Sequence, residues 1–416
     1  MPRVVLVTGK GGVGKTTTAA ATAVQAARTG LRTLVLSTDA AHSLGDALDV
    51  GLHTAPTWRD THEVEPGLHA LAVGAHTDVA SHWEVVRDYL LRVLDAMGVD
   101  AVVADELAAL PGVEEVAALA ALAHQADSGA WDVIVVDCAP TAETLRLLAL
   151  PEVLGWHLDR LLPAQRRLLT VLRPAATAAA GVPAPGAEVL GTVRAWRRLL
   201  VGVRELLTSP RASVRLVVTP ERVVIAESRR VLTSLSLHGY AVDGVVVNRL
   251  LPAPRPGDVD PWRTAWADAQ VQGLQQVRES FSGIPLLLAP YLAGEPIGPD
   301  ALAALAGATE ADGDAGGTGS EPGGAPALLD DVDVPRMRVE ADGEDFVLTL
   351  PLPLVTAGEV ELARREDDLV LAVGDQRRVV TLPSVLRRCI VQNAAVGNGE
   401  LRVRFERDEE LWASGR

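Results

Sequence analysis

The stretch RVVLVTGKGGVGKTTT, residues 3–18, decides the fold of this chain. It opens with a short β-branched run, which is typical of a strand buried on both faces of a parallel sheet. A glycine loop follows, and residues 15–30 then predict an alanine-rich helix that ends at Gly30. Residues 32–39 predict a second buried strand, which ends on a carboxylate. The order strand, helix, strand is the unit from which parallel sheets are built.

The same alternation recurs farther along the chain. Further elements are predicted, in chain order, over residues 113–126 (helix), 131–137 (strand), 142–156 (helix), 214–220 (strand), 221–239 (helix) and 241–252 (strand). Pro220 is expected at the first helical position, where its missing N–H costs nothing. The pattern predicts an α/β fold with a doubly wound, mostly parallel sheet.

The alternation breaks twice, and the breaks predict the domain organisation. Residues 152–212 predict helices split by a low-complexity loop, which form a helical subdomain. Residues 307–334 are rich in glycine and acidic side chains and predict a disordered linker. Residues 335–408 alternate apolar and polar side chains and predict a small antiparallel β-sandwich. We therefore expect one large α/β domain over residues 1–306, a linker and a β domain.

Charge and cysteine content exclude several classes of protein. The 416 residues carry a formal net charge of −16, and an acidic surface repels nucleic acid, so a general nucleic-acid-binding role is disfavoured. The two cysteines, Cys138 and Cys389, provide neither a disulfide framework nor a zinc-ligand pair and favour the reducing cytoplasm. The sequence predicts neither a secretory leader nor a membrane-spanning segment.

Residues 9–16 fit the phosphate-binding pattern G-x-x-x-x-G-K-[ST]. In such a loop the glycines let backbone N–H groups surround the β-phosphate, and the helix N-terminus adds its positive end. Lys15 is expected to bind the β- and γ-phosphate oxygens, and the Thr16 hydroxyl is expected to bind Mg²⁺. Nucleotide contacts are predicted for the whole loop, namely Gly9, Lys10, Gly11, Gly12, Val13, Gly14, Lys15, Thr16 and Thr17. The alternative, a glycine-rich turn that binds nothing, is disfavoured because lysine is so rare in this chain.

Lys10 and Lys15 are the only lysines in the sequence. An ordinary phosphate-binding loop needs no lysine at its second position, since one cation already serves the γ-phosphate of its own nucleotide. Lys10 is therefore either an exposed surface residue or a residue with a second role.

Two segments resemble one family of ATPases. Residues 9–17, GKGGVGKTT, resemble the deviant phosphate loop of dimeric ATPases. Residues 34–48, LVLSTDAAHSLGDAL, are similar to the first switch of the ArsA/Get3 family, the arsenite-pump and tail-anchored-protein-targeting ATPases. The resemblance covers residues 3–306. It implies a P-loop fold and a dimer in which Lys10 contacts nucleotide phosphates in the partner subunit.

Two carboxylates match the family's catalytic positions. Asp39 matches its water-positioning residue, and a carboxylate at a strand end beside a phosphate loop can orient water, complete the magnesium shell or simply cap the next helix. Residues 133–148, VIVVDCAPTAETLRLL, resemble the second switch, in which Asp137 matches the acid that orders magnesium. The predicted catalytic residues are Lys10, Lys15 and Asp39, and the predicted magnesium set is Thr16, Asp39 and Asp137. The sequence departs from this switch at Cys138, Ala142 and Glu143, which puts its coupling in question.

The resemblance also extends to the adenine pocket and the β domain. Asn248, Pro290 and Tyr291 fall where the family contacts adenine, although a strand-end turn and a loop proline would explain them equally simply. Residues 335–408 look like the HSP20-like, small heat-shock-type β-sandwich that some bacterial members carry.

The sequence favours a magnesium-dependent ATPase whose dimer closes around ATP and acts on a client or partner. The second subunit is identical or a paralogue, and the client is hydrophobic or a membrane protein. The alternative is an ATP-gated chaperone with negligible turnover.

The sequence disfavours other functions. A partition-type regulator is disfavoured by the net negative charge of the chain. An arsenite pump is disfavoured because a metalloid site needs several thiolates. Six of the nine histidines lie between residues 42 and 82, but loops and a strand separate them, so no metal or zinc site is predicted.

Overall fold

The computed structural model describes residues 1–38, 43–52, 60–73, 88–89, 91, 113–138, 186–252, 260–313, 332, 337–374, 376–409 and 412. The chain divides into two compact units. The first comprises residues 1–212, 292–309 and 325–331, and the second comprises residues 213–291, 310–324 and 332–416.

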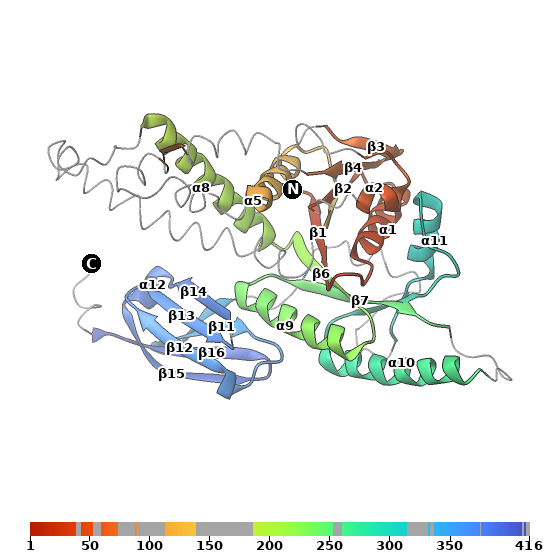
Figure 1. Cartoon of the computed structure of the whole chain (residues 1–416). Coiled ribbons are helices and arrows are strands. Elements are labelled where there is room, and N and C mark those ends of the chain that lie inside the picture. Colours follow the sequence, from red (N-terminus) through yellow and green to blue (C-terminus); the bar gives the residue numbers. More distant parts are fainter. Residues whose placement is uncertain are drawn as a thin grey trace. The chain divides into compact units, whose positions relative to one another are not determined.

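Five strands of the first unit lie in the order β3-β4-β2-β5-β1 (Figure 1). They are β1 (Arg3–Thr8), β2 (Thr33–Ser37), β3 (His62–Glu65), β4 (Leu68–Ala72) and β5 (Val133–Asp137). β1, β5, β2 and β4 pair in parallel, and β3 is the antiparallel edge strand. Every residue of β1, β2 and β5 is buried, as continuous β-branched runs require.

The described helices of the first unit are α1 (Lys15–Arg28), α2 (Ser43–Leu48), α5 (Val113–Asp127), α8 (Ala187–Leu207) and α11 (Pro299–Ala308). α1 packs on β1, β2 and β5, and its alanines allow this close approach because they carry no long side chain. Gly30, with φ 93°, ends the turn after α1, as the sequence predicts. α8 lies in the predicted helical subdomain. The predicted helix over residues 142–156 lies outside the described residues.

The second unit begins with another α/β segment. Its elements are β6 (Ala212–Val218), α9 (Arg222–His238), β7 (Val242–Leu250), α10 (Pro261–Ser280), β8 (Leu286–Pro290) and β9 (Glu310–Ala311). β6, β7 and β8 are parallel neighbours, and β9 pairs antiparallel with β8. The prediction that Pro220 is the first helical residue is wrong, because α9 begins at Arg222 with Glu221 as its N-cap. The Thr219 hydroxyl bonds the Glu221 carboxylate, and this turn delays the helix.

The ordered chain continues past Gly307, where the linker was predicted to begin. α11 runs to Ala308, and β9 then extends the sheet. The Asp312 carboxylate accepts two hydrogen bonds from Arg278 of α10, at 2.7 and 2.9 Å. Most of the predicted linker, residues 314–331, lies outside the described residues.

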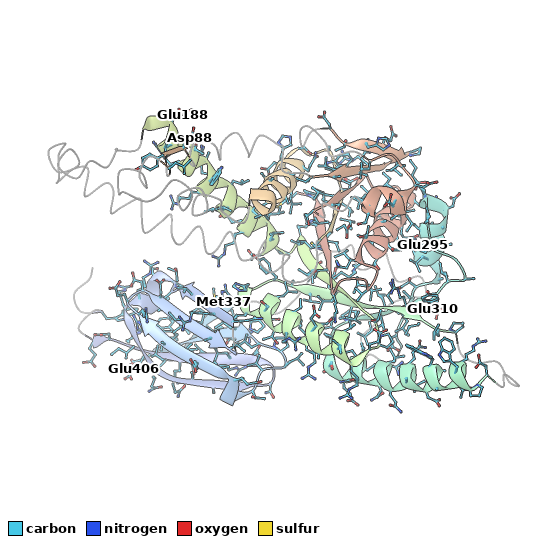
Figure 2. All side chains as sticks on the ribbon, in the orientation of Figure 1. Asp88, Glu188, Glu295, Glu310, Met337 and Glu406 are labelled. Atoms are coloured by element: carbon cyan, nitrogen blue, oxygen red, sulfur yellow. The ribbon has the colours of Figure 1, made fainter. Side chains whose placement is uncertain are left out.

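The C-terminal part of the second unit is an antiparallel β domain. Its strands are β10 (Arg338–Asp342), β11 (Asp345–Pro351), β12 (Val360–Arg365), β13 (Asp368–Val373), β14 (Gln376–Thr381), β15 (Cys389–Gly397) and β16 (Glu400–Arg407). They form one sheet in the order β10-β11-β16-β15 and a second in the order β12-β13-β14, with the short elements η2 (Ala357–Glu359) and α12 (Ser384–Arg387) between strands. Side chains such as Leu350, Leu371 and Phe405 form its core. Figure 2 draws the side chains of this domain on its ribbon.

These observations confirm the predicted fold class, a mostly parallel α/β sheet with a separate antiparallel β domain. Within the described part of the chain, none of the helices has the length and apolar character that crossing a membrane requires.

Candidate functional site

The glycine loop joins the end of β1 at Thr8 to the start of α1 at Lys15. Gly12 and Gly14 adopt φ angles of 81° and 93°, in the left-handed region that side chains other than glycine rarely enter. Gly14 is also the N-cap of α1, which lacks a side-chain cap. The first N–H groups of a helix have no acceptor within the helix, so the start of α1 is a place where an anion can bind, and phosphate is the ligand that such a site favours.

The Lys15 side chain lies back over the loop. It is 9% exposed, and its Nζ donates a long hydrogen bond of 3.4 Å to the carbonyl oxygen of Lys10. The Val13 N–H points to the same carbonyl at 3.5 Å. This geometry holds a nearly buried ammonium at the loop, where it can neutralise phosphate charge.

The threonines after Lys15 have different surroundings. The Thr18 hydroxyl donates to the Gly14 carbonyl at 2.8 Å and is used in closing the first turn of α1. The Thr16 hydroxyl instead faces the Ser43 hydroxyl, at 3.4 Å, and is half-buried. Thr17 is half-buried as well. The Thr18 hydroxyl is thus occupied within the helix, whereas Thr16 has a hydroxyl that could serve a metal ion.

Asp137 ends β5 and is fully buried. In the sheet it lies beside Val7 of β1 and Ser37 of β2, and the Ser37 hydroxyl donates to its Oδ2 at 3.4 Å. The Thr38 N–H donates to its main-chain oxygen at 3.0 Å. The Asp137 carboxylate at the end of β5 and the Thr16 hydroxyl in the first turn of α1 are hard oxygen donors of the kind that Mg²⁺ prefers, so the chemistry of these residues fits that ion.

The first and second switches are only partly described. Asp39, Ala142 and Glu143 lie outside the described residues. Cys138 is buried, its N–H donates to the carbonyl of Val7, and its thiol donates to the carbonyl of Val136. The Cys138 thiol, which departs from the family pattern, therefore forms its hydrogen bond with a carbonyl of β5, the strand that it follows.

The predicted adenine contacts lie in the second unit, at the ends of two adjacent strands. Asn248 is buried in β7, and its Oδ1 accepts from the N–H of Arg249 at 2.8 Å. Pro290 ends β8 opposite Leu250, and the Tyr291 N–H donates to the Leu250 carbonyl at 2.8 Å. The Tyr291 ring is 55% exposed. The structure thus brings these three residues to one edge of the β7–β8 pair.

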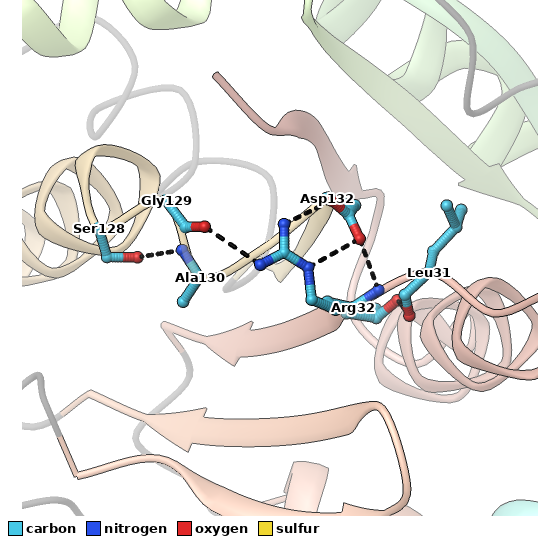
Figure 3. A network of polar contacts seen from close by, with 7 residues as sticks. Leu31, Arg32, Ser128, Gly129, Ala130 and Asp132 are labelled. Carbon is cyan, nitrogen blue, oxygen red and sulfur yellow. Dashed lines mark hydrogen bonds and ion pairs between the residues drawn. The ribbon is translucent and has the colours of Figure 1, made fainter.

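An ion pair aligns the strands that carry the polar residues of the site. Arg32 precedes β2 and Asp132 precedes β5, and they meet through side-chain bonds of 2.7 and 3.1 Å and a main-chain bond of 2.9 Å (Figure 3). The hydrogen bonds from the Arg32 side chain, followed by that from its N–H, lower the pKa of Asp132 to about 2. The pair joins the starts of β2 and β5, and the register of these strands places Ser37 beside Asp137.

Sequence reasoning missed Ser37 and Ser43, the hydroxyls that contact the predicted magnesium residues. A signal for Ser37 was present in the sequence. Ser37 ends the buried strand β2 and Asp137 ends the neighbouring strand β5, and the last residues of adjacent parallel strands lie side by side. Ser43 had no such signal, since a contact across 27 residues is set by the packing of α2. Among the described residues, no group of three or more histidine, cysteine or acidic side chains is arranged to hold a metal.

Comparisons with known proteins identify both parts of the chain. Residues 2–309 match the family described as anion-transporting ATPase, and residues 343–405 match the HSP20-like domain found in ArsA. An uncharacterized protein of Streptomyces coelicolor is 38% identical over 100% of both chains. A putative arsenical pump-driving ATPase of Chlorobaculum tepidum is 32% identical over 98% of this chain and 97% of its own. The ATPase GET3B of Arabidopsis thaliana is 31% identical over 71% of this chain and 75% of its own.

Proposed function

We propose that this chain, which belongs to the anion-transporting ATPase family and is an ATPase, hydrolyses ATP as a magnesium-dependent dimer that closes around the nucleotide. The observation that carries the proposal is the nearly buried Lys15 ammonium, which lies over a glycine loop at the start of α1. Such a loop binds the phosphates of a nucleotide, and the relatives named as ATPases support ATP as that nucleotide.

The phosphate-binding roles follow from the geometry of the loop. The backbone N–H groups around Gly12 and Gly14 bind the β-phosphate, and Lys15 binds the β- and γ-phosphate oxygens. Thr16 and Asp137 would hold Mg²⁺, with Ser37 fixing the orientation of the Asp137 carboxylate through its hydrogen bond. The ion, when bound, neutralises charge on the phosphates. Asp39 is the residue we assign to positioning the attacking water.

The dimer is proposed on Lys10. Lys15 alone serves the nucleotide of its own subunit, and Lys10 is the only other lysine in a chain that uses arginine elsewhere. A compact ammonium fits among phosphate oxygens better than the broad guanidinium of arginine. We therefore assign Lys10 to the nucleotide of the partner subunit, which is identical or a paralogue.

The coupled process is binding or release of a client or partner protein, and we place the protein in the cytoplasm. The HSP20-like domain also supports a second candidate, a chaperone in which ATP gates a client surface and turnover is negligible.

Some relatives are named as arsenical pump-driving ATPases. A metalloid site built by one chain needs more soft ligands than Cys138 and Cys389 supply, and both thiols are buried.

Lys10→Arg tests the dimer, and sedimentation with and without magnesium and ATP measures it. We expect wild-type protein to dimerise with nucleotide, and Lys10→Arg to bind nucleotide but remain monomeric. Unchanged nucleotide-dependent dimerisation would remove the role of Lys10 in the partner subunit.

Steady-state hydrolysis with and without an unfolded or tail-anchored protein separates the two candidate functions. Turnover that the added protein stimulates supports the coupled ATPase. Dimerisation without measurable turnover supports the ATP-gated chaperone.

A further inference from the structure

Helix α9 is buried on two faces at its C-terminal end. Along its length Ile225, Ser228, Leu232 and Leu235 follow the spacing of one helical face, and the helix packs on β7. Leu237 comes two residues after Leu235 and therefore lies about 200° round the helix from it. Leu237 is nevertheless fully buried, because it belongs to the apolar core of the β domain.

A side chain of the β domain completes the end of this helix. Gly239, with φ 83°, closes α9 with bonds from its own N–H to the Ser236 carbonyl and from the Tyr240 N–H to the Leu235 carbonyl. This arrangement leaves the Leu237 carbonyl without an intrahelical donor. Arg378 of β14 donates to that oxygen, and the Arg378 residue is only 5% exposed. The guanidinium also complements the negative end of the helix dipole.

The charge of a residue on the same helix also acts on η2. Glu359 of η2 accepts hydrogen bonds from the N–H and hydroxyl of Thr356, which are the main reason that its pKa lies below its ordinary value. Arg229 of α9 lowers the pKa of Glu359 further through its charge. The helix α9 thus makes an apolar and a hydrogen-bonding contact to the β domain at its C-terminal end, and the charge of Arg229 acts on Glu359.

The other end of α9 is fixed near the predicted adenine contacts. Val218, the last residue of β6, lies beside Val247, and the next residue of β7 is Asn248. The turn from Thr219 to Glu221 is packed against α10, where the Pro220 carbonyl lies so close to Gly273 that a Cβ there would overlap it. The first turn of α9 therefore starts from a rigid corner at the edge that carries Asn248.

We propose that α9 couples the β domain to the candidate adenine-binding edge, through a clamp made by Leu237 and Arg378. The helix has 17 residues, so it spans about 25 Å between the clamp and the corner. A packed helix of this length moves as one body, because shifting one end displaces buried contacts at the other. A protein that binds the β domain would then change nucleotide affinity, and nucleotide would change the stability of the clamp by the same factor. The proposal rests on the proposed function in so far as the ligand is a nucleotide.

Arg378→Ala tests the clamp, with Arg377→Ala as the matched control. Arg377 is the preceding residue of β14 and its side chain is exposed. Hydrogen exchange of the full-length protein would be measured by mass spectrometry over residues 235–241, which include the bonded N–H groups of Gly239 and Tyr240. We expect exchange in Arg378→Ala to be faster by about tenfold or more, because a buried carbonyl loses its charged donor. Arg377→Ala should leave it unchanged.

The same proteins test the coupling, with a non-hydrolysable ATP analogue and magnesium as the probe. We expect the Kd of Arg378→Ala to rise by about threefold or more, and the analogue to slow exchange over residues 235–241 in the wild type by a similar factor. Faster exchange with unchanged nucleotide affinity would show a structural clamp and overturn the coupling. Unchanged exchange would overturn the clamp itself.

Two further measurements keep these outcomes separable. If Arg378→Ala does not fold, Arg378→Lys retains the charge and one donor direction, and it should show an intermediate exchange rate and an intermediate Kd. If wild-type protein fails to bind the analogue, the proposed function is wrong while the exchange result still decides the clamp. Equal exchange and Kd in Arg378→Lys and Arg377→Ala would contradict the proposal, since lysine cannot reproduce the planar donor of arginine.

Discussion

The phosphate loop and the clamp on α9 differ in how far apart their residues lie in sequence. Gly14, Lys15 and Thr18 are neighbours, and their contacts form within one loop and one helical turn. Leu237 and Arg378 are 141 residues apart and meet only when the β domain is docked on α9. The loop depends on local backbone conformation, whereas the clamp depends on the complete core of the second unit. Substitutions in the loop should therefore change ATP hydrolysis with little loss of stability, whereas substitutions in the clamp should change the stability of the second unit first and nucleotide affinity through it.

Lys15→Ala should have the largest effect and should be confined to activity. We expect ATP hydrolysis to fall by about 100-fold or more, because the cation that stabilises charge on the phosphates is lost. Steady-state phosphate release measures this, and thermal unfolding without nucleotide should change little, since the hydrogen bond from Lys15 to the Lys10 carbonyl is a long one of 3.4 Å. Normal hydrolysis by the variant would show that the loop is not the ATP site.

Leu237→Ala should have the opposite signature, a large loss of stability. Removing a fully buried leucine from the β-domain core should cost about 2–5 kcal/mol. Urea unfolding measures the change. Val223→Ala on the same helix is the control, because Val223 is 66% exposed and should cost little. Equal effects of the two substitutions would mean that α9 is not covered by the β domain.

The same contrast explains what the sequence could predict. The strand before the loop, the loop and α1 were predictable because their signals lie within 26 residues, from Arg3 to Arg28. The helix α10 was missed because its buried positions are Gly273, Val277 and Ser280, which provide no apolar stripe.

The candidate site shows the same division. Asp137 was predictable from the strand that it ends and from its family resemblance, but its partner Ser37 depends on sheet register. The clamp was not predictable, because Leu237 lies off the apolar face of α9 and Arg378 resembles any polar residue of an alternating strand.

Gly273→Ala tests a contact of intermediate range, between α10 and the turn before α9. In an exposed helix this change stabilises by about 1 kcal/mol. Here the added Cβ would overlap the Pro220 carbonyl, so we expect a loss of about 1–3 kcal/mol. Gly202→Ala in α8 is the matched control, because a Cβ there meets nothing within 4 Å. Urea unfolding should give opposite signs for the two variants, and stabilisation by Gly273→Ala would show that the corner can yield.

Asp132→Asn should have the smallest effect, and that effect should depend on pH. Hydrogen bonds from Arg32 lower the pKa of Asp132 to about 2, from an ordinary value of 3.8. Because the folded-state pKa is the lower one, the carboxylate stabilises the fold above about pH 4 and loses this contribution as the pH falls towards 2. The Asp132 side chain is 39% exposed, so solvent screening limits the contribution to less than about 1 kcal/mol. The stability of the wild type should therefore exceed that of Asp132→Asn at pH 6, and this difference should shrink below about pH 4 and disappear below about pH 2. Asp127→Asn, at the exposed end of α5, is the control and should show a smaller difference. A difference for Asp132→Asn that is as large below pH 2 as at pH 6 would mean that the charge of the Asp132 carboxylate does not stabilise the fold.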